Sequence, residues 1–368
     1  MRLSTIEGLK GLAILFVTLF HLDFNSFSGG FIGVDIFFVI SGFLITGSVL
    51  RDIGDNNFSL WNFYNRRIRR LFPAMLFTLG ISAIVAFYTL SPQHFESYAG
   101  SVISSLFLVS NIFFYSESGY FGIDAIFKPL LHLWAIGVIG QFYLFFPLIL
   151  LFLLKFRKKH LLLIGLLLLG ITSLVASEYY TQVDLDAAYF LTPLRFFEFI
   201  IGSMCYWLKE LKIPDKFKEF GIIAGLTLII YSATFFHKYT PFPGFNALVP
   251  TIGVALVILS KNPRYSGYIL RNKIITHIGK ISYSLYLVHW PIIVFFNYMS
   301  FITVTLSEKT ILLLASLICG EILYLLIEIP NNTKSKNKKF LIVIGLFMLL
   351  MTTPAIHAWN NQGWKWRL

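Results

Sequence analysis

The sequence predicts an all-α fold: a polytopic integral membrane helix bundle of about eleven transmembrane helices. Of its 368 residues, 57% are hydrophobic and only 13% are charged, whereas a typical soluble domain is about 25% charged. The mean hydropathy is +0.74. Many hydrophobic residues gather in runs of roughly 17–22 residues, which is long enough for a helix to cross a bilayer.

The candidate spans follow one another along the whole chain. They are residues 8–24, 31–50, 71–90, 132–154, 161–177, 187–207, 219–236, 246–260, 277–298, 309–328 and 338–356. One further apolar stretch, 97–115, contains five serines, at positions 97, 101, 104, 105 and 110. This composition suits a half-wet re-entrant or interfacial helix on the outer face better than a helix in lipid.

The distribution of basic residues predicts the topology. Five loops are rich in Lys and Arg: 51–70, 155–160, 207–219, 260–273 and 331–339. Short cytoplasmic loops carry an excess of these residues, and all five loops fall on that side only if 97–115 does not span. The N-terminus is therefore expected to be cytoplasmic and the C-terminus periplasmic or extracellular. The same clustering explains the net charge of +12 without nucleic-acid binding.

Two regions are expected along the chain. Residues 1–330 would form one membrane domain of about ten spans, with the extra helix near 97–115. Residues 331–368 would add a transmembrane helix and a linker-like extracytoplasmic tail, "HAWNNQGWKWRL". Cys205 and Cys319 both lie in apolar segments, so the sequence predicts neither a disulfide framework nor a metal site.

Ionisable residues inside the first two spans are candidates for a functional site, because charges at membrane depth are costly. Lys10 and His21 are eleven residues apart, which on a helix places them within about 20° of one face and about 16 Å apart along the axis. Asp35, in the second span, shares a face with Gly42 and could orient His21. Alternatively, Lys10 snorkels to the surface, His21 marks the interface, and Asp35 sits at a wet helix end.

The stretch "NFYNRRIRRLFP" (62–73) raises a second question of function. Arg66 and Arg70 are neighbours at i,i+4, and Arg67 and Arg70 at i,i+3. A topology signal would explain this cluster on its own. Arginine in particular, however, favours bidentate binding of phosphate, so a phosphate-holding patch is the other interpretation.

Polar residues in later spans are further candidates for the functional site. The fourth span opens with His132 and Trp134 and carries Gln141, which must find a partner if it is buried. Arg195 and Glu198 have i,i+3 spacing, which also fits a purely structural ion pair. The ninth span contains Tyr283, Tyr286, His289 and Trp290. An aromatic belt would explain Trp290 and the tyrosines, and explains His289 less well.

Five stretches occur in an order and spacing that resemble membrane acyltransferase family 3, the O-antigen and peptidoglycan O-acetyltransferase type. They are "GLKGLAILFVTLFH", "GGFIGVDIFFVISGFLIT", "FYNRRIRRLFPA", "LLHLWAIGVIGQFYL" and "IGKISYSLYLVHWP". The resemblance covers roughly residues 5–330. In fused members, the last span and tail lead to a periplasmic SGNH domain, which this sequence does not contain. The resemblance thus implies a stand-alone or truncated form, with a separate SGNH-type protein as a candidate partner.

The resemblance also assigns roles to single residues. The family's basic residue, ten-residue gap and histidine correspond to Lys10 and His21, although Arg is usual at the first position. Its Arg-x-x-Arg element corresponds to Arg67 and Arg70.

A longer family pattern matches the fourth span only in part. The pattern His-x-Trp-Ser-x-x-x-Glu-x-Gln-Phe-Tyr is matched here by His132, Trp134, Gln141, Phe142 and Tyr143. Ala135 replaces the usual Ser and Ile139 replaces the usual Glu. Loss of that carboxylate leaves a catalytically impaired or non-catalytic member as an alternative.

The implied activity is transfer of an acetyl (acyl) group from cytoplasmic acetyl-CoA to a hydroxyl of a cell-surface glycan, such as the lipopolysaccharide O-antigen, or of a lipid-linked glycan. The protein would be a multi-pass protein of the bacterial inner membrane, surrounded by membrane lipid and without a metal. A transporter of a glycan or lipid intermediate is a further alternative, but no convincing inverted repeat supports it.

In this hypothesis, Arg67 and Arg70, with Arg66 or Arg69 assisting, hold the CoA phosphates at the cytoplasmic mouth. The pantetheine arm then passes Lys10 toward His21. His21 acts as general base on the sugar hydroxyl or first accepts the acyl group, and Asp35 orients its ring.

Overall fold

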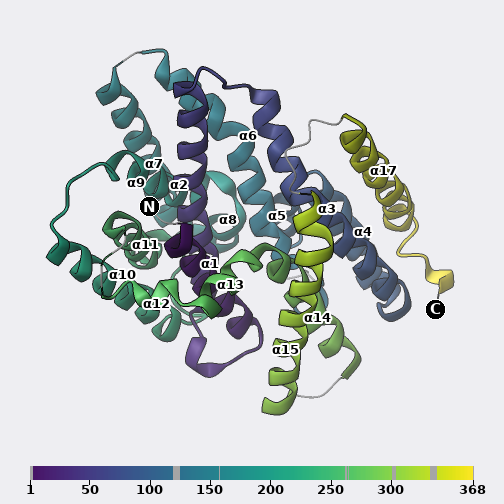
Figure 1. Ribbon diagram of the computed structural model, residues 1–368. Helices are drawn as coiled ribbons and strands as arrows, with labels where there is room; N and C mark the ends of the chain where they lie inside the picture. The colour runs from purple at the N-terminus through teal and green to yellow at the C-terminus, as the bar shows by residue number, and fades with distance from the viewer. Residues whose placement is uncertain are drawn as a thin grey trace. The chain divides into compact units, whose positions relative to one another are not determined.

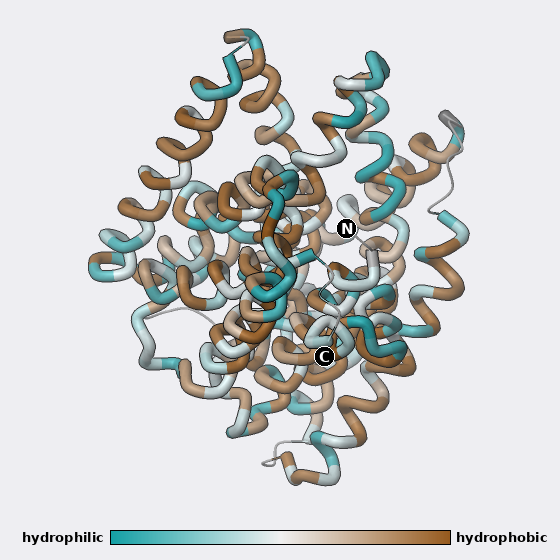
Figure 2. Tube along the Cα trace, turned by 60° about the vertical axis from the view of Figure 1, so that its left-hand side comes forward, coloured by the Kyte–Doolittle hydropathy of each residue, from teal (hydrophilic) through white to brown (hydrophobic). Residues whose placement is uncertain are grey.

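The computed structural model describes residues 3–118, 125–156, 158–261, 263, 265–300, 304–331 and 338–367. Within these residues every regular element is a helix (Figure 1). The long helices are hydrophobic along most of their length, and hydrophilic residues gather near their ends and in the connections (Figure 2). Large apolar side chains also face outward: Leu350 is 68% exposed and Leu326 is 67% exposed. An all-helical protein with outward-facing leucines on long apolar helices fits a membrane bundle.

The chain forms two compact units. Unit 1 comprises Met1–Leu60 and Gln141–Ser282, and unit 2 comprises Trp61–Gly140 and Tyr283–Leu368. Each unit is therefore built from two stretches that are distant in sequence.

Unit 1 contains the first two helices and the middle of the chain. Its elements are α1 (Leu3–His21), η1 (Asn25–Phe27), η2 (Gly30–Ile32), α2 (Gly33–Gly54), most of α6 (Trp134–Leu154), α7 (Lys159–Val183), α8 (Leu185–Phe190), α9 (Thr192–Leu208), α10 (Asp215–Phe235), η5 (Gly244–Ala247), α11 (Leu248–Ser260), α12 (Tyr268–Arg271) and α13 (Lys273–Lys280).

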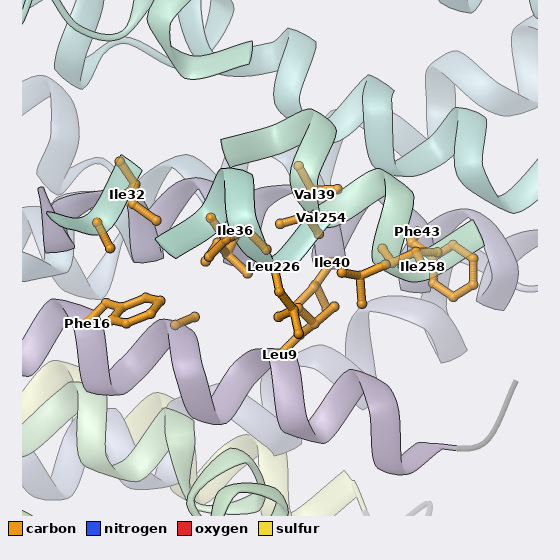
Figure 3. Close-up of a cluster of buried hydrophobic side chains, with 14 of the residues drawn as sticks. Leu9, Phe16, Ile32, Ile36, Val39, Ile40, Phe43, Leu226, Val254 and Ile258 are labelled. Carbon is orange, nitrogen blue, oxygen red and sulfur yellow. The ribbon is translucent and has the colours of Figure 1, made fainter. Parts of the chain in front are cut away.

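The core of unit 1 lies between α1, α2, α10 and α11. Side chains from these four helices point toward one another, among them Leu9, Ile36, Leu226 and Val254 (Figure 3). All four are at most 6% exposed. The core is apolar, so the polar groups inside this unit must find partners among themselves.

Glycines let the helices of unit 1 cross with their backbones in contact. A Cβ on Gly42 of α2 would lie 1.9 Å from the Phe199 carbonyl oxygen of α9, and one on Gly202 of α9 would lie 1.8 Å from the Val39 carbonyl oxygen of α2. The two helices thus pass each other with a glycine on each side of the crossing. This close approach brings the first turns of α2 and α9 together.

Unit 2 contains the remaining helices. They are α3 (Leu60–Thr89), α4 (Pro92–Leu106), α5 (Ser110–Ser116), η3 (Ala125–Phe127), η4 (Leu131–Leu133), the start of α6, α14 (Ser282–Ser300), α15 (Leu306–Leu323), the π-helical turn η6 (Tyr324–Glu328), α16 (Ile329–Asn331), α17 (Lys338–Asn360) and η7 (Lys365–Arg367).

The segment predicted as a re-entrant or interfacial helix forms α4 and α5. Neither has the length and composition of a span, and α4 packs along α17 (Figure 1). All five serines of this segment are buried, from 9% exposed at Ser97 to 1% at Ser110. The expected half-wet surface was therefore wrong. The hydroxyls are buried against neighbouring groups instead: Ser110, for example, donates to the Leu133 carbonyl at 2.8 Å.

The number of spans is only partly supported. Eight helices among the described residues are long and apolar enough to cross a membrane, and the bent pair α13–α14 would make nine. The two other predicted spans correspond to α8–α9, broken at Leu191, and to the shorter Gly244–Ser260 stretch. The basic loop predicted at 331–339 lies mostly at 332–337, outside the described residues.

Candidate functional site

A fully buried cluster of three charged residues forms where α2 and α9 meet in unit 1. Arg195 Nη2 lies 2.8 Å from Asp35 Oδ1, and Arg195 Nε lies 3.2 Å from Glu198 Oε1. No side chain in the cluster is more than 1% exposed. The Gly42–Gly202 crossing described above explains how residues 160 positions apart reach hydrogen-bonding distance.

The cluster contains two carboxyl groups and one guanidinium. Asp35 and Glu198 are direct neighbours. Three of their four oxygens, Asp35 Oδ2 and both oxygens of Glu198, receive no hydrogen bond from any residue that the structure describes. A buried net charge is costly, so one proton shared between the two carboxyls would balance the cluster and supply the missing hydrogen bond.

Asp35 does not have the partner that we expected. Its Oδ1 accepts from Arg195, so the predicted role in orienting His21 is replaced by an ion pair with α9. The physical reason is that a fully buried guanidinium on the facing helix competes for the carboxylate far more strongly than a neutral imidazole does. The alternative of a wet helix end is also wrong, since Asp35 is 0% exposed.

Lys10 and His21 lie on the single helix α1, as predicted, and both side chains are partly buried. His21 is the last residue of α1, and its ring packs against Phe20. Lys10 Nζ pairs with Glu7 Oε1 at 3.1 Å. Sequence reasoning missed Glu7, although its i,i+3 spacing from Lys10 was a usable signal.

The arginines of the 62–73 stretch belong to α3 in unit 2. Arg66 is exposed, and Arg67 and Arg70 are half-buried. Arg69 is different: it is 6% exposed, donates from Nε to Asn65 Oδ1 at 3.0 Å, and stacks 4.4 Å from the Phe340 ring. Three arginines thus remain as candidates for binding phosphate, and Arg69 has a packing role.

His132 and His289 come together in the interior of unit 2, with ring centroids 5.7 Å apart. His132 Nε2 lies 3.2 Å from the Leu287 carbonyl, and His289 Nδ1 lies 2.8 Å from the Tyr286 carbonyl. Because a carbonyl can only accept, the proton of each neutral ring must sit on the nitrogen that faces it. The basic nitrogens are therefore Nδ1 of His132 and Nε2 of His289.

The aromatic residues near His289 are part of the same packing. The hydroxyl of Tyr286 donates to the His132 carbonyl, and Trp290 Nε1 donates to the Lys128 carbonyl at 2.9 Å. Tyr283 donates to the Leu71 carbonyl at 2.7 Å. These polar atoms bind the backbone of unit 2, and the belt interpretation stays a prediction.

The remaining candidates lie on α6. Trp134 is buried, 5% exposed. Gln141 is half-buried and accepts from the Thr192 hydroxyl, so it has the partner that its place in a span predicted. Tyr143 is half-buried on the same helix. Ile139, where the family usually has Glu, brings no carboxylate to this helix.

Two further polar pairs in unit 2 were not predicted. Ser284 donates to Glu328 Oε2 at 2.6 Å, and Lys128 Nζ pairs with Glu117 Oε2 at 3.1 Å. Both join segments that are far apart or irregular, so no local spacing in the sequence revealed them.

Comparison with known proteins finds several relatives that are named as O-acetyltransferases. The chain is 34% identical to the peptidoglycan O-acetyltransferase OatA of Listeria monocytogenes over 89% of this chain and 55% of the relative. It is 33% identical to the putative peptidoglycan O-acetyltransferase YrhL of Bacillus subtilis over 78% of this chain and 48% of the relative. It is 29% identical to the O-acetyltransferase OatA of Staphylococcus aureus over 98% of this chain and 63% of the relative.

The chain spans about half to just under two thirds of the length of these relatives. No solved structure matches it. A family model described as an acyltransferase domain matches residues 3–325, which is most of the chain and includes every candidate residue discussed above. On this match, the chain belongs to membrane acyltransferase family 3.

Proposed function

We propose that this protein is a membrane O-acyltransferase that transfers an acetyl or similar acyl group from cytoplasmic acetyl-CoA to a hydroxyl of a cell-surface glycan. The observation that carries the proposal is the match of residues 3–325 to an acyltransferase domain. The names of the relatives from Listeria and Bacillus favour a glycan of the peptidoglycan type over the lipopolysaccharide O-antigen.

In this proposal, His21 carries the proton chemistry. A sugar hydroxyl is a poor nucleophile at neutral pH, so its proton must be removed as its oxygen attacks the thioester carbon. The His21 imidazole takes that proton, the C–S bond breaks, and the proton passes to the leaving thiolate to give CoA thiol. The products are the glycan ester and CoA, and no other reactant is consumed. His21 suits this role because it ends a helix that otherwise packs deep in unit 1.

The donor is held through its phosphates by arginines of α3. Three guanidinium groups, of Arg66, Arg67 and Arg70, lie within one turn and a half of that helix, and Arg66 is exposed. Guanidinium groups bind phosphate oxygens in pairs. Lys10, which is paired with Glu7, is a cation on the same helix as His21.

A non-catalytic role is the second candidate, and Ile139 is the observation that favours it. Restoring the family pattern tests it directly. If the Ala135→Ser, Ile139→Glu double variant gains acetylation where the natural sequence shows none, the natural chain is catalytically impaired. Equal activity of both forms would contradict that alternative.

The main test measures the envelope glycans by mass spectrometry in cells with and without the gene. We expect the mass increment of an acetyl group on a sugar, lost in the deletion strain and restored by the natural gene. His21→Ala should fail to restore it while reaching the same level in the membrane. His160→Ala serves as the matched control, because His160 is an exposed imidazole at the start of α7. Full acetylation by the His21→Ala variant would refute the proposed role of His21.

A further inference from the structure

An apolar cavity of about 350 Å³ lies within unit 2 between α3, α4 and α17. Its volume falls in the range of small-molecule sites, about 300–1,000 Å³. The lining includes Leu79, Ala83, Phe95, Val102 and Met351. Tyr98 also contributes, but its hydroxyl already binds Ser82 Oγ at 2.7 Å. A water molecule or polar ligand would need two or more polar partners, so this lining suits a hydrocarbon chain.

The cavity is open toward the surroundings of α3. Ile84 and Tyr88 line it and are 63% and 75% exposed. Both belong to α3, one of the helices with the length and composition of a membrane span. A hydrocarbon chain could therefore enter sideways from the bilayer, without passing through water.

One residue of the tail lines this cavity, and two others lie beside it. Trp364 lines it and stacks on Trp366, with ring centroids 6.0 Å apart and 29° between the planes. Trp366 is 75% exposed. The Arg367 guanidinium lies 4.2 Å from the ring of Phe95, another lining residue.

Arg367 also closes the end of α3. Its Nη2 donates to the Leu90 carbonyl at 2.6 Å, and its Nη1 donates to the Phe87 carbonyl. Its Nε, which is buried, makes no hydrogen bond to a residue within the described ranges. Desolvation lowers the pKa of Arg367, but an arginine stays protonated. A positive charge therefore sits beside the cavity and the exposed indole.

The cavity, the cation and the exposed indole each suit one chemical group of a single class of ligand. The cavity fits a hydrocarbon chain, the cation fits a phosphate, and an exposed indole face fits the apolar face of a sugar ring. We propose that this site binds a lipid-linked glycan, a polyisoprenyl chain joined through phosphate to a sugar, as the form in which the acceptor is presented. This rests on the proposed function, because it names the anchoring group of that acceptor.

Two simpler occupants explain less of the site. A phospholipid would fill the cavity and meet the cation, but it has no ring to stack on Trp366. An aromatic belt at the membrane surface would place tryptophans here, but it gives no reason for an indole pair stacked next to an arginine over a cavity. Trp359 offers a comparison: it is 42% exposed, packs on Phe113, and does not line the cavity.

Binding to the purified full chain, measured by native mass spectrometry without acetyl-CoA, tests the proposal. The probes are a polyisoprenyl diphosphate disaccharide, the sugar-free polyisoprenyl phosphate, and phosphatidylglycerol. We expect the disaccharide lipid to bind at least tenfold more tightly than phosphatidylglycerol. Ala83→Phe, which fills the cavity, should weaken both polyisoprenyl probes at least tenfold.

Trp366→Ala should weaken only the probe that carries sugar, and Trp359→Ala should change neither. Trp366 is exposed, so its variant is expected to fold even if Ala83→Phe does not. Equal binding of the disaccharide lipid and phosphatidylglycerol, or equal effects of the two tryptophan variants, would overturn the site. Such a result alongside normal His21-dependent acetylation of glycans would leave the proposed function standing, because binding is measured without the donor.

Discussion

Arginines that look equivalent in the sequence differ in the structure. Arg69 is buried against Asn65 and Phe340, whereas Arg67 and Arg70 remain partly accessible. The Arg67→Lys, Arg70→Lys double variant keeps the positive charge but loses the planar fork. We predict that acetylation at low acetyl-CoA falls about tenfold or more, since hydrogen bonds to charged groups contribute about 1.5–3 kcal/mol each. The measurement is the KM for acetyl-CoA in purified membranes.

The control for this prediction is Arg51→Lys. Arg51 is exposed, belongs to the same predicted cytoplasmic loop, and lies near the end of α2. It should leave the KM unchanged. If the double variant also leaves it unchanged, the arginines serve only as a topology signal.

The charge balance of the Asp35–Arg195–Glu198 cluster, in which the two carboxyls would share one proton, leads to a second prediction. Glu198→Gln should be tolerated, because the amide donates the hydrogen bond that the proton would supply and leaves one carboxylate for one guanidinium. Arg195→Gln should destabilise the protein by about 3–5 kcal/mol, because it leaves buried carboxyls without their cation. Thermal unfolding of the purified protein in detergent measures both effects.

The exposed pair Lys218–Asp215 provides the matched comparison. It has the same i,i+3 spacing, but Asp215 is 93% exposed, so Asp215→Asn should change the stability by less than about 1 kcal/mol. Equal destabilisation by the Glu198→Gln and Arg195→Gln variants would show that the two carboxyls do not share a proton.

At the residue scale, the sequence identified candidate site residues more reliably than it identified the groups that they contact. Polar residues in apolar runs are conspicuous, and Arg195–Glu198 follows from helix spacing. The Asp35–Arg195 hydrogen bond could not be predicted from the sequence. The two residues are 160 positions apart and meet only where α2 and α9 cross. The pairing of His132 with His289 has the same cause: the helices η4 and α14 meet only in the folded unit 2.

At the scale of elements, the crossing of α2 and α9 controls the charge cluster. Gly42→Leu would place a side chain against the Phe199 carbonyl, so the helices would have to separate and Arg195 would lose Asp35. We predict a loss of at least about 3 kcal/mol, the upper end for overpacked cores, seen as loss of monodisperse protein after extraction.

Gly345→Leu is the matched control for that crossing. Gly345 also lies in a long helix, α17, but a Cβ there meets nothing within 4 Å. This variant should be extracted like the natural protein. If both leucine variants behave alike, the close approach of α2 and α9 does not hold unit 1 together.

Hydrophobic length predicted most of the long helices, because it is a local property. It did not predict the environment of α4, whose serines are buried although a serine-rich helix suggests contact with water. Packing against α17 and α5 decides that environment, and no signal within residues 97–115 carries it. The break at Leu191 between α8 and α9 was also missed, although Pro193 follows it and prolines are common near helix starts.

At the scale of the whole molecule, Arg367 joins the C-terminal tail to the end of α3. Its bonds to the last carbonyls of α3 place the tail and the end of α3 together, so both belong on one side of the membrane. The predicted topology places both outside. This agreement does not determine the number of spans. If the two short candidates, α8–α9 and Gly244–Ser260, do not cross, the count falls from eleven to nine. The end of α3 and the tail stay outside in both cases.

The loop between α9 and α10 separates these two counts. With eleven spans it is cytoplasmic, and with nine it is outside. It contains Lys209 and Lys212, and basic residues in short loops favour the cytoplasmic side. We therefore predict that Lys212→Cys, in a chain whose two natural cysteines are replaced by serine, stays unlabelled by a membrane-impermeant maleimide in intact cells. It should react once the membrane is opened.

The Tyr239→Cys variant, in the connection between α10 and η5, is the internal comparison. Tyr239 is 77% exposed, and the eleven-span topology places it outside, so it should react in intact cells. The nine-span topology reverses both results, because α10 would then run in the opposite direction. Labelling of position 212 without labelling of 239 would thus show that α8–α9 does not cross. It would also place the basic loop at 207–219 outside, against the charge rule from which the topology was derived.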